Sequence, residues 1–287
     1  MSCVARFLRA CFRPARVSPF RSPSLLSERE TDPRELGPDR IAGYRRRVAG
    51  SVDESAGGTE RSGYTPLDNP ARAALTGPHA RFAERVGTAL RYHPDVCPMA
   101  ALPDGPTAED WADAARLVGP GGALFLPVVA DTPPAGWQSK MHLPGVQMVD
   151  AGVPARPDDA VIRLTADDVP EMTDLVRRTR PGPFRKRTIE MGTYLGIRRN
   201  GRLIAMGGER LTLLGHTEIS AVCTDPDHRG QGLASRLVLA LAQGIGDRGA
   251  TPILHAEATN VNAIRLYEQL GFQVRKEVLF QVVIAPS

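Results

Sequence analysis

The stretch Ser220-Ala-Val-Cys-Thr-Asp-Pro-Asp-His-Arg-Gly-Gln-Gly-Leu-Ala234 determines how the rest of the chain is interpreted. It starts with small and β-branched residues typical of a strand, breaks at Asp225-Pro226, and passes through Gly230 and Gly232 into an apolar run. A strand, a glycine turn and a helix N-terminus leave backbone N–H groups unpaired where the helix dipole adds partial positive charge. The stretch therefore predicts a phosphate-binding site, to which Arg229 adds a full positive charge.

The composition is that of a globular protein with enough material for a buried core. The chain has 287 residues, of which 42% are hydrophobic and 24% are charged. Its four cysteines form no CxxC pair and no repeated Cys/His spacing of a zinc site, which argues against disulfides or structural zinc and fits the reducing cytoplasm. Every apolar run is shorter than the roughly 20 residues that cross a bilayer. We therefore expect a cytoplasmic protein with no metal and no membrane contact.

The net charge of +4 is small and comes partly from the N-terminal tail, so nucleic-acid binding by this tail is the weaker hypothesis. Residues 1–65 are rich in Arg, Ser, Pro and Gly and show no sustained periodicity, which predicts a disordered tail. No Asp or Glu precedes Glu28, as in a mitochondrial transit peptide. A plain extension or a start codon assigned too far upstream is favoured, because the rest of the chain has the same composition bias.

Residues 66–158 predict a small α/β domain without a catalytic constellation. Phe82, Val86 and Leu90 have helical spacing, and Thr107 precedes acidic residues as a helix N-cap does. Its helix-then-strand order raises the hypothesis that this domain is a degenerate half-copy of the one that follows. The predicted elements are a helix within residues 78–92, a helix at 108–118, and strands at 123–129 and 146–149.

Residues 159–287 predict a second domain in which strands and helices alternate. Thr165 is a predicted N-cap, and Asn200-Gly201 is a strong hairpin-turn dipeptide. The predicted strands are 161–164, 193–198, 202–207, 217–224 and 252–256, the predicted helices are 166–178, 233–245 and 260–270, and a closing hairpin joins 272–274 to 278–284.

Two motifs of this second domain resemble the GNAT superfamily of acyl-CoA-dependent N-acyltransferases. Arg229-Gly-Gln-Gly-Leu-Ala234 fits the Arg/Gln-x-x-Gly-x-Gly/Ala signature at the head of the CoA-binding helix. Asn260-Val-Asn-Ala-Ile-Arg-Leu-Tyr-Glu-Gln-Leu-Gly-Phe272 fits the family's Asn-x-x-Ala…Leu-Tyr-Glu-x-x-Gly-Phe ending. The resemblance covers about residues 160–287 and is strongest to the glycine N-acyltransferase-like branch. It implies the GNAT fold, an α/β fold with a mixed sheet, in the C-terminal half.

The resemblance implies acetyl-CoA as the acyl donor and direct transfer of its acetyl group to a primary amine of a small molecule or peptide. The residue types agree with this, because helix N-terminal N–H groups suit the CoA pyrophosphate. The spacings of Rossmann and Walker phosphate loops are absent from the sequence. The implied cofactor-binding residues are Val222, Cys223, Thr224, Arg229, Gly230, Gln231, Gly232, Leu233, Ala234, Ser235 and Asn260.

Two residues are implied to be catalytic. Tyr267 occupies the family's general-acid position near the CoA sulfur, and its alternative role is to pack the helix between Ile264 and Leu270. Glu218 occupies a position where relatives carry a base that acts directly or through water, and its alternative is a strand-end glutamate facing solvent. His216 is a less favoured base. Cys223 is interpreted as a small core residue, because direct transfer needs no acyl-cysteine.

Residues 184–187, Phe-Arg-Lys-Arg, fall where the family's acceptor loop runs. They predict either an acidic acceptor or an ordinary solvated charged surface. The alternative for the whole chain is a non-catalytic acyl-CoA-binding module with a sensor or regulatory role. It keeps the CoA site and differs from the enzyme at Tyr267 and Glu218.

Overall fold

A computed structural model describes residues 65–127 and 132–287 of the chain. The predicted tail, with its transit-peptide alternative, lies outside the described residues except for Thr65, and so does the end of the strand predicted at 123–129. In the part of the chain that is described, no helix is both long and apolar enough to cross a membrane.

Eight strands form one sheet, in which only the pair β9–β10 is parallel and every other neighbouring pair is antiparallel. Helices pack against this mixed sheet, so the predicted α/β fold class with a mixed sheet is confirmed. The strands across the sheet are β4 (Ala123–Leu126), β11 (Phe272–Ile284), β5 (Gln138–Asp150), β10 (Thr251–Glu257), β9 (His216–Thr224), β8 (Arg202–Leu213), β7 (Tyr194–Arg199) and β6 (Val161–Arg163).

The helices cover both faces of the sheet. Met206 packs in one cluster with Met172 and Leu175 of α5, whereas its strand neighbour Ala205 packs with Leu237 of α6. Neighbouring residues of a strand point to opposite faces, so α5 and α6 lie on opposite sides. The described helices are α3 (Pro70–Leu75), α4 (Ala108–Val118), α5 (Val169–Thr179), α6 (Leu233–Gly246) and α7 (Val261–Gln269), with 3₁₀ turns η2 (Ala80–Phe82), η3 (Ala166–Asp168), η4 (Thr188–Met191) and η5 (Pro226–His228).

Local signals place several elements as the sequence predicts. Asn200 and Gly201 both have positive φ, 51° and 76°, as the tight turn between β7 and β8 requires. Thr107 caps α4 in a full capping box with Asp110, whose carboxylate accepts the Thr107 N–H at 2.7 Å. Thr165 forms a capping box too, although a 3₁₀ turn precedes α5.

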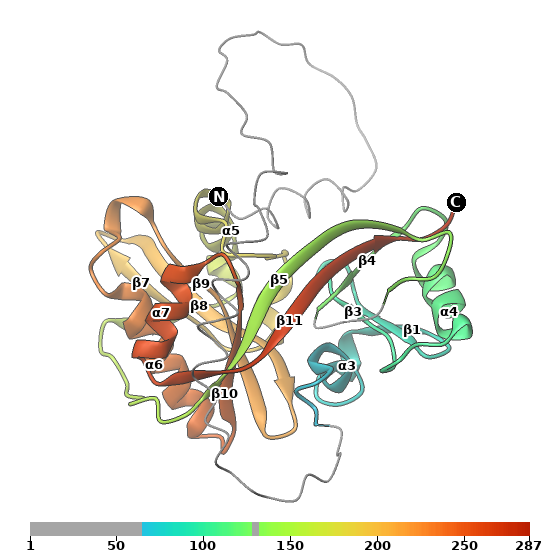
Figure 1. The fold of residues 1–287 in the computed structure, drawn as a ribbon. Coiled ribbons are helices and arrows are strands. Elements are labelled where there is room, and N and C mark those ends of the chain that lie inside the picture. Colours follow the sequence, from blue (N-terminus) through green and yellow to red (C-terminus); the bar gives the residue numbers. More distant parts are fainter. Residues whose placement is uncertain (1–64, 128–131) are drawn as a thin grey trace, which may run out of the picture. The chain divides into compact units, whose positions relative to one another are not determined.

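The predicted closing hairpin is wrong. Residues 272–284 form the single strand β11, which runs antiparallel beside β5 (Figure 1). The segment Arg275-Lys276-Glu277 contains no turn residue, and the pairing with β5 shifts register between Val274 and Lys276. A β-bulge therefore bends the strand where a turn was expected, and the strand continues.

The helix predicted within residues 78–92 is also wrong. The segment forms η2 and then the hairpin of β1 (Ala83–Val86) and β2 (Ala89–Tyr92), to which β3 (Ala100–Ala101) adds a third strand. Gly87 has φ of 52°, and the Thr88 N–H donates to Asp113 of α4 at 2.8 Å. A glycine turn anchored by a distant helix thus overrides the helical spacing of the apolar residues.

Residues on both sides of position 159 share one sheet and one hydrophobic core. β5 lies between β10 and β11, and β4 pairs with the far edge of β11. Leu67 and Phe125 are buried in the same cluster as Ile253 and Phe280. The hypothesis that residues 66–158 are a degenerate half-copy of the second domain stays a prediction.

Candidate active site

A cleft opens where two parallel strands part. β10 pairs with β9 over residues 251–254, opposite residues 216–219, and no strand of the described residues pairs with β9 on that side beyond Ile219. β9 also carries a bulge, because Gly208 pairs with Ser220 but Met206 pairs with Cys223, and Ala221 has φ of 54°. A non-glycine residue at positive φ stores strain, and such strain is frequent at functional sites. Backbone groups of β9 therefore face an open space.

The cleft has a volume of about 1180 Å³. This exceeds the roughly 300–1,000 Å³ typical of pockets for one drug-sized ligand. Of the residues predicted from the sequence, Glu218, the less favoured base His216 and the loop 184–187 are not among the described residues that line the cleft. The predicted residues that line it are Val222, Cys223, Thr224, Arg229, Gly230, Gln231, Gly232, Leu233, Ala234, Ser235, Asn260 and Tyr267.

The glycine turn leads directly into α6. Gly230 and Gly232 have φ of 74° and 71°, and a Cβ atom at either would meet no protein atom within 4 Å. Glycine is thus required at positions 230 and 232 by the positive φ of the backbone, and the space beside the turn stays open. Among the residues that the structure describes, no side chain caps α6, so the first N–H groups of this helix remain available to a ligand.

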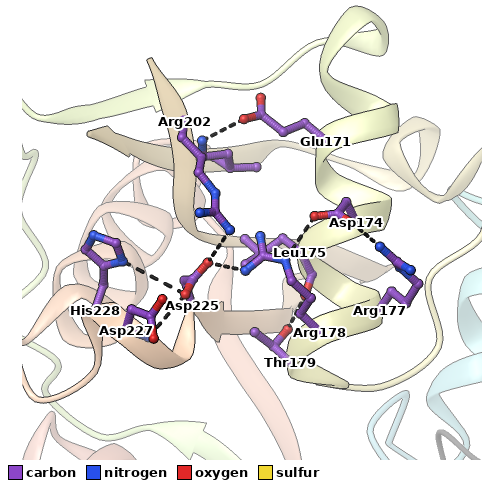
Figure 2. A network of polar contacts seen from close by, with 11 residues as sticks. Glu171, Asp174, Leu175, Arg177, Arg178, Thr179, Arg202, Asp225, Asp227 and His228 are labelled. Atoms are coloured by element: carbon purple, nitrogen blue, oxygen red, sulfur yellow. Dashed lines mark hydrogen bonds and ion pairs between the residues drawn. The ribbon is translucent and has the colours of Figure 1, made fainter. Parts of the chain in front are cut away.

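A buried aspartate, Asp225, lies just before the glycine turn and is held by a network of polar contacts (Figure 2). Asp225 accepts hydrogen bonds from the guanidinium groups of Arg178 on α5 and Arg202 on β8, and from the Asp227 N–H at 3.1 Å. Burial alone raises its pKa, but the Asp227 N–H and the two guanidinium groups outweigh burial, so the pKa of Asp225 is lowered. The network ties the end of α5 to the glycine turn. From the sequence, the Asp-Pro pair indicated only a chain break.

Replacing Arg178 with methionine should destabilise the fold by about 1–3 kcal/mol, because it leaves a buried carboxylate short of a donor. Arg177, next to it on α5, has the half-exposed Asp174 as its ion-pair partner within the described part of the chain, so Arg177→Met should cost at most about 0.5 kcal/mol. The pKa of Asp225 is lowered on folding, so its contribution is present above its unfolded pKa of about 3.9 and is lost as pH falls. Urea unfolding at pH 7 and pH 3 measures the free energy of unfolding of both variants and its dependence on pH. Equal losses of this free energy in Arg178→Met and Arg177→Met would contradict the role of Arg178.

Tyr267 reaches the cleft from α7. Asn260 caps this helix, because its Oδ1 accepts the Ala263 N–H at 3.3 Å, and the Tyr267 ring packs edge-on against Phe272 at 6.2 Å. Burial raises the pKa of Tyr267 to about 12. Its hydroxyl makes no hydrogen bond to another described residue. At neutral pH the side chain is thus a protonated donor at the cleft wall.

Glu218 is fully buried, so the alternative of a solvent-facing glutamate is wrong. Its carboxylate accepts hydrogen bonds from Arg210 Nε at 2.8 Å and from His255 Nδ1 at 2.7 Å. Burial opposes ionisation, but the charge of Arg210 and the hydrogen bonds from Arg210 and His255 outweigh it and lower the pKa of Glu218 to about 2. The groups of this cluster that line the cleft are Arg210 and His255.

His255 is held at both ring nitrogens. The Gln147 amide donates to the Leu67 carbonyl at 2.8 Å and accepts from Arg275 at 2.9 Å, so its NH₂ group faces His255 Nε2 at 3.0 Å. This orientation assigns the proton of the neutral ring to Nδ1, toward Glu218, and makes Nε2 an acceptor. Sequence analysis missed His255, because no local pattern marks it and its partner Gln147 is 108 positions away.

The surroundings of Cys223 and of the loop 184–187 indicate no catalytic role for them. Cys223 is buried, and burial raises the pKa of its thiol to about 11, so it carries little thiolate at neutral pH. In the loop 184–187, Lys186 pairs with Asp95 at 2.8 Å and Arg187 with Glu190 at 2.7 Å. No residue of that loop is among the described residues that line the cleft. Within 65–127 and 132–287, no group of three His, Cys, Asp or Glu residues is arranged to hold a metal ion.

Comparison with known proteins agrees with this geometry. The family described as FR47-like protein matches residues 194–281. The chain is 36% identical to a solved putative acetyltransferase of the GNAT family from Novosphingobium aromaticivorans, with a TM-score of 0.71, covering 78% of this chain and 100% of that one. A solved GCN5-related N-acetyltransferase from Kribbella flavida, 18% identical with a TM-score of 0.52, covers 77% and 96% and shares the fold.

Among curated proteins, the ribosomal protein bS18-alanine N-acetyltransferase of Escherichia coli K12 is 29% identical over 120 residues, which are 40% of this chain and 80% of that protein. The chain belongs to the GNAT family. It is an acetyltransferase, so the enzyme interpretation is confirmed over the non-catalytic module. GNAT acetyltransferases use acetyl-CoA as the donor. The particular resemblance to the glycine N-acyltransferase-like branch stays a prediction.

Proposed function

We propose that the protein transfers the acetyl group of acetyl-CoA to a primary amine by direct attack within the cleft between β9 and β10. The observation that carries the proposal is the juxtaposition, in one cleft, of an uncapped helix N-terminus, a protonated tyrosine and a histidine bound to a carboxylate. The first element suits a pyrophosphate, and the other two suit proton transfer.

The donor would lie along β9 and the glycine turn. Arg229, Gly230, Gln231, Gly232, Leu233, Ala234 and Ser235 would hold the pyrophosphate through the N–H groups of the turn and α6. Val222, Cys223 and Thr224 lie where β9 has lost its strand partner, so their backbone groups would bind the pantetheine arm as a neighbouring strand does. Asn260 would contact the donor from the start of α7. Arg178 and Arg180 line the same cleft and add positive charge.

In the transfer, the amine nitrogen attacks the thioester carbon, the new C–N bond forms and the C–S bond breaks. We assign Tyr267 to donate its proton to the departing thiolate, which leaves as free CoA thiol. The raised pKa keeps this hydroxyl protonated until the sulfur develops charge. Its contact with Phe272 holds the ring without using the hydroxyl.

We assign removal of the amine proton to His255, with Glu218 acting through it. Glu218 is a poor direct acceptor, because Arg210 and His255 lower its pKa to about 2 and it does not line the cleft. His255 Nε2 would exchange the Gln147 donor for the proton of the amine, and the Glu218 carboxylate beside Nδ1 would stabilise the imidazolium that forms.

The test is a screen of amines with acetyl-CoA. The release of free thiol is measured for each amine, and mass spectrometry detects the acetylated amine. The panel should contain peptides with N-terminal alanine, since the E. coli relative is named for such an acceptor, and glycine, which the predicted branch would suggest. We expect thiol and acetylated amine in equal amounts for at least one class. Thiol release without acetylated product would contradict the proposal.

A further inference from the structure

One end of the cleft has an apolar wall to which the glycine turn contributes nothing. Four side chains form it: Met99, Phe125 of β4, Leu143 of β5 and Phe280 of β11. Met99 bridges to Phe125, and Leu143 pairs across strands with Phe280. We call these four residues the apolar wall. Three of them come from the region before residue 159.

The apolar wall is preformed. All four side chains belong to one buried cluster and are at most 9% exposed. The Phe280 ring stands 6.4 Å from the Phe125 ring and 6.2 Å, edge-on, from His255. Gly145 makes room for it, since a Cβ atom there would lie 2.4 Å from the ring and 2.7 Å from the Ala256 carbonyl oxygen. The wall thus reaches the histidine that would take the amine proton.

The charges beside the apolar wall cancel one another. Glu218 is bound by Arg210 and His255, and the ring proton of His255 faces Glu218. No residue of the basic loop 184–187 lines the cleft, and Lys186 and Arg187 are paired with acids outside it. The two polar side chains that line the cleft beside the wall, Arg210 and His255, thus have partners within the protein, and the four side chains of the wall itself are apolar. Such a surface favours apolar groups and opposes charged ones, which would lose their hydration.

We infer that the acceptor is a primary amine with an aromatic or branched aliphatic substituent close to its nitrogen, and that Met99, Phe125, Leu143 and Phe280 select this substituent. The inference rests on the proposed function, because it places the amine at His255. The region before residue 159, which contributes three of the four side chains, would thus help to select the acceptor. The glycine turn and α7 would bind the donor.

Amino-acid amides test the inference, because they share one amine and differ only in the substituent. We expect kcat/KM for leucinamide and phenylalaninamide to exceed that for glycinamide by about 10–200-fold, the range for added methylene groups in an apolar pocket, and glutamic acid 1-amide to be poor. If no amine releases thiol, the proposed function fails. If glycinamide or glutamic acid 1-amide reacts as fast as phenylalaninamide, acetyl transfer stands and the inference is wrong.

A matched pair of variants tests the residues. Phe125→Leu should lower the phenylalaninamide-to-glycinamide ratio of kcat/KM about tenfold, because the wall loses a ring. Phe82→Leu makes the same substitution in the same buried cluster but away from the cleft, and should leave the ratio unchanged. Equal ratios in both variants, each folded by thermal melting, would overturn the assignment. Phe280→Leu provides the same readout should Phe125→Leu fail to fold.

Discussion

Replacing Tyr267 with phenylalanine is expected to lower kcat by about 10²–10⁴-fold, the usual contribution of a general acid. The substitution keeps the ring against Phe272 and removes only a hydroxyl that bonds to no other described residue. Stability and the Kd for acetyl-CoA should therefore change little. Steady-state kinetics with an acceptor from the amine screen, together with calorimetric titration of acetyl-CoA, measure the three quantities.

The leaving group provides the control for this prediction. An acetyl thioester of a more acidic thiol needs less protonation as the C–S bond breaks, so the loss caused by Tyr267→Phe should shrink with such a donor. Unchanged activity of the variant with acetyl-CoA would support the alternative that Tyr267 only packs α7. An equal loss with both donors would mean that the hydroxyl serves positioning and not proton donation.

Replacing His255 with glutamine is expected to lower kcat/KM by about 10²–10⁴-fold, the usual contribution of a general base. Glutamine preserves a donor toward Glu218 and removes the ring nitrogen that would accept the amine proton. Steady-state kinetics of the wild type and the variant with an acceptor from the amine screen measure the loss. A variant with normal activity would exclude His255 as the base.

Glu218→Gln distinguishes the two possible bases. If Glu218 acts through His255, removal of its charge makes the imidazolium harder to form, so kcat/KM falls but by less than in His255→Gln. If Glu218 is itself the base, this variant loses activity at every pH and His255→Gln stays active. Because Arg210 is left buried and unpaired, folding is checked by thermal melting, and Arg210→Met/Glu218→Gln removes both charges together.

Local signals explain what the sequence could predict. Gly230 and Gly232 mark the turn by positive φ, and the motif around Tyr267 places α7 beside it. Asn200-Gly201 marks its hairpin because only a few residue pairs adopt that turn. Each of these features is encoded within a few neighbouring positions, so the donor side of the cleft follows from short segments.

The acceptor side depends on contacts between distant residues. Gln147 reaches His255 only because β5 inserts between β10 and β11, a pairing that carries no local turn signal. The sequence left open whether Glu218 is a base or a strand-end glutamate that faces solvent. Its side chain is fully buried, and it interacts electrostatically with Tyr92 and Cys97, which precede position 159. Pairing over such separations depends on the whole sheet, so Arg210, His255 and the apolar wall were not identified from the sequence.

The most direct test of the central claim is the affinity for acetyl-CoA when the glycine turn is altered. Gly232→Val places a β-branched residue at φ of 71°, so the turn must move and the Kd should rise about tenfold or more. Gly246→Ala, at the other end of α6 where a Cβ meets nothing, is the matched control and should bind as the wild type does. Equal Kd values for all three proteins would contradict the claim that this cleft holds the donor.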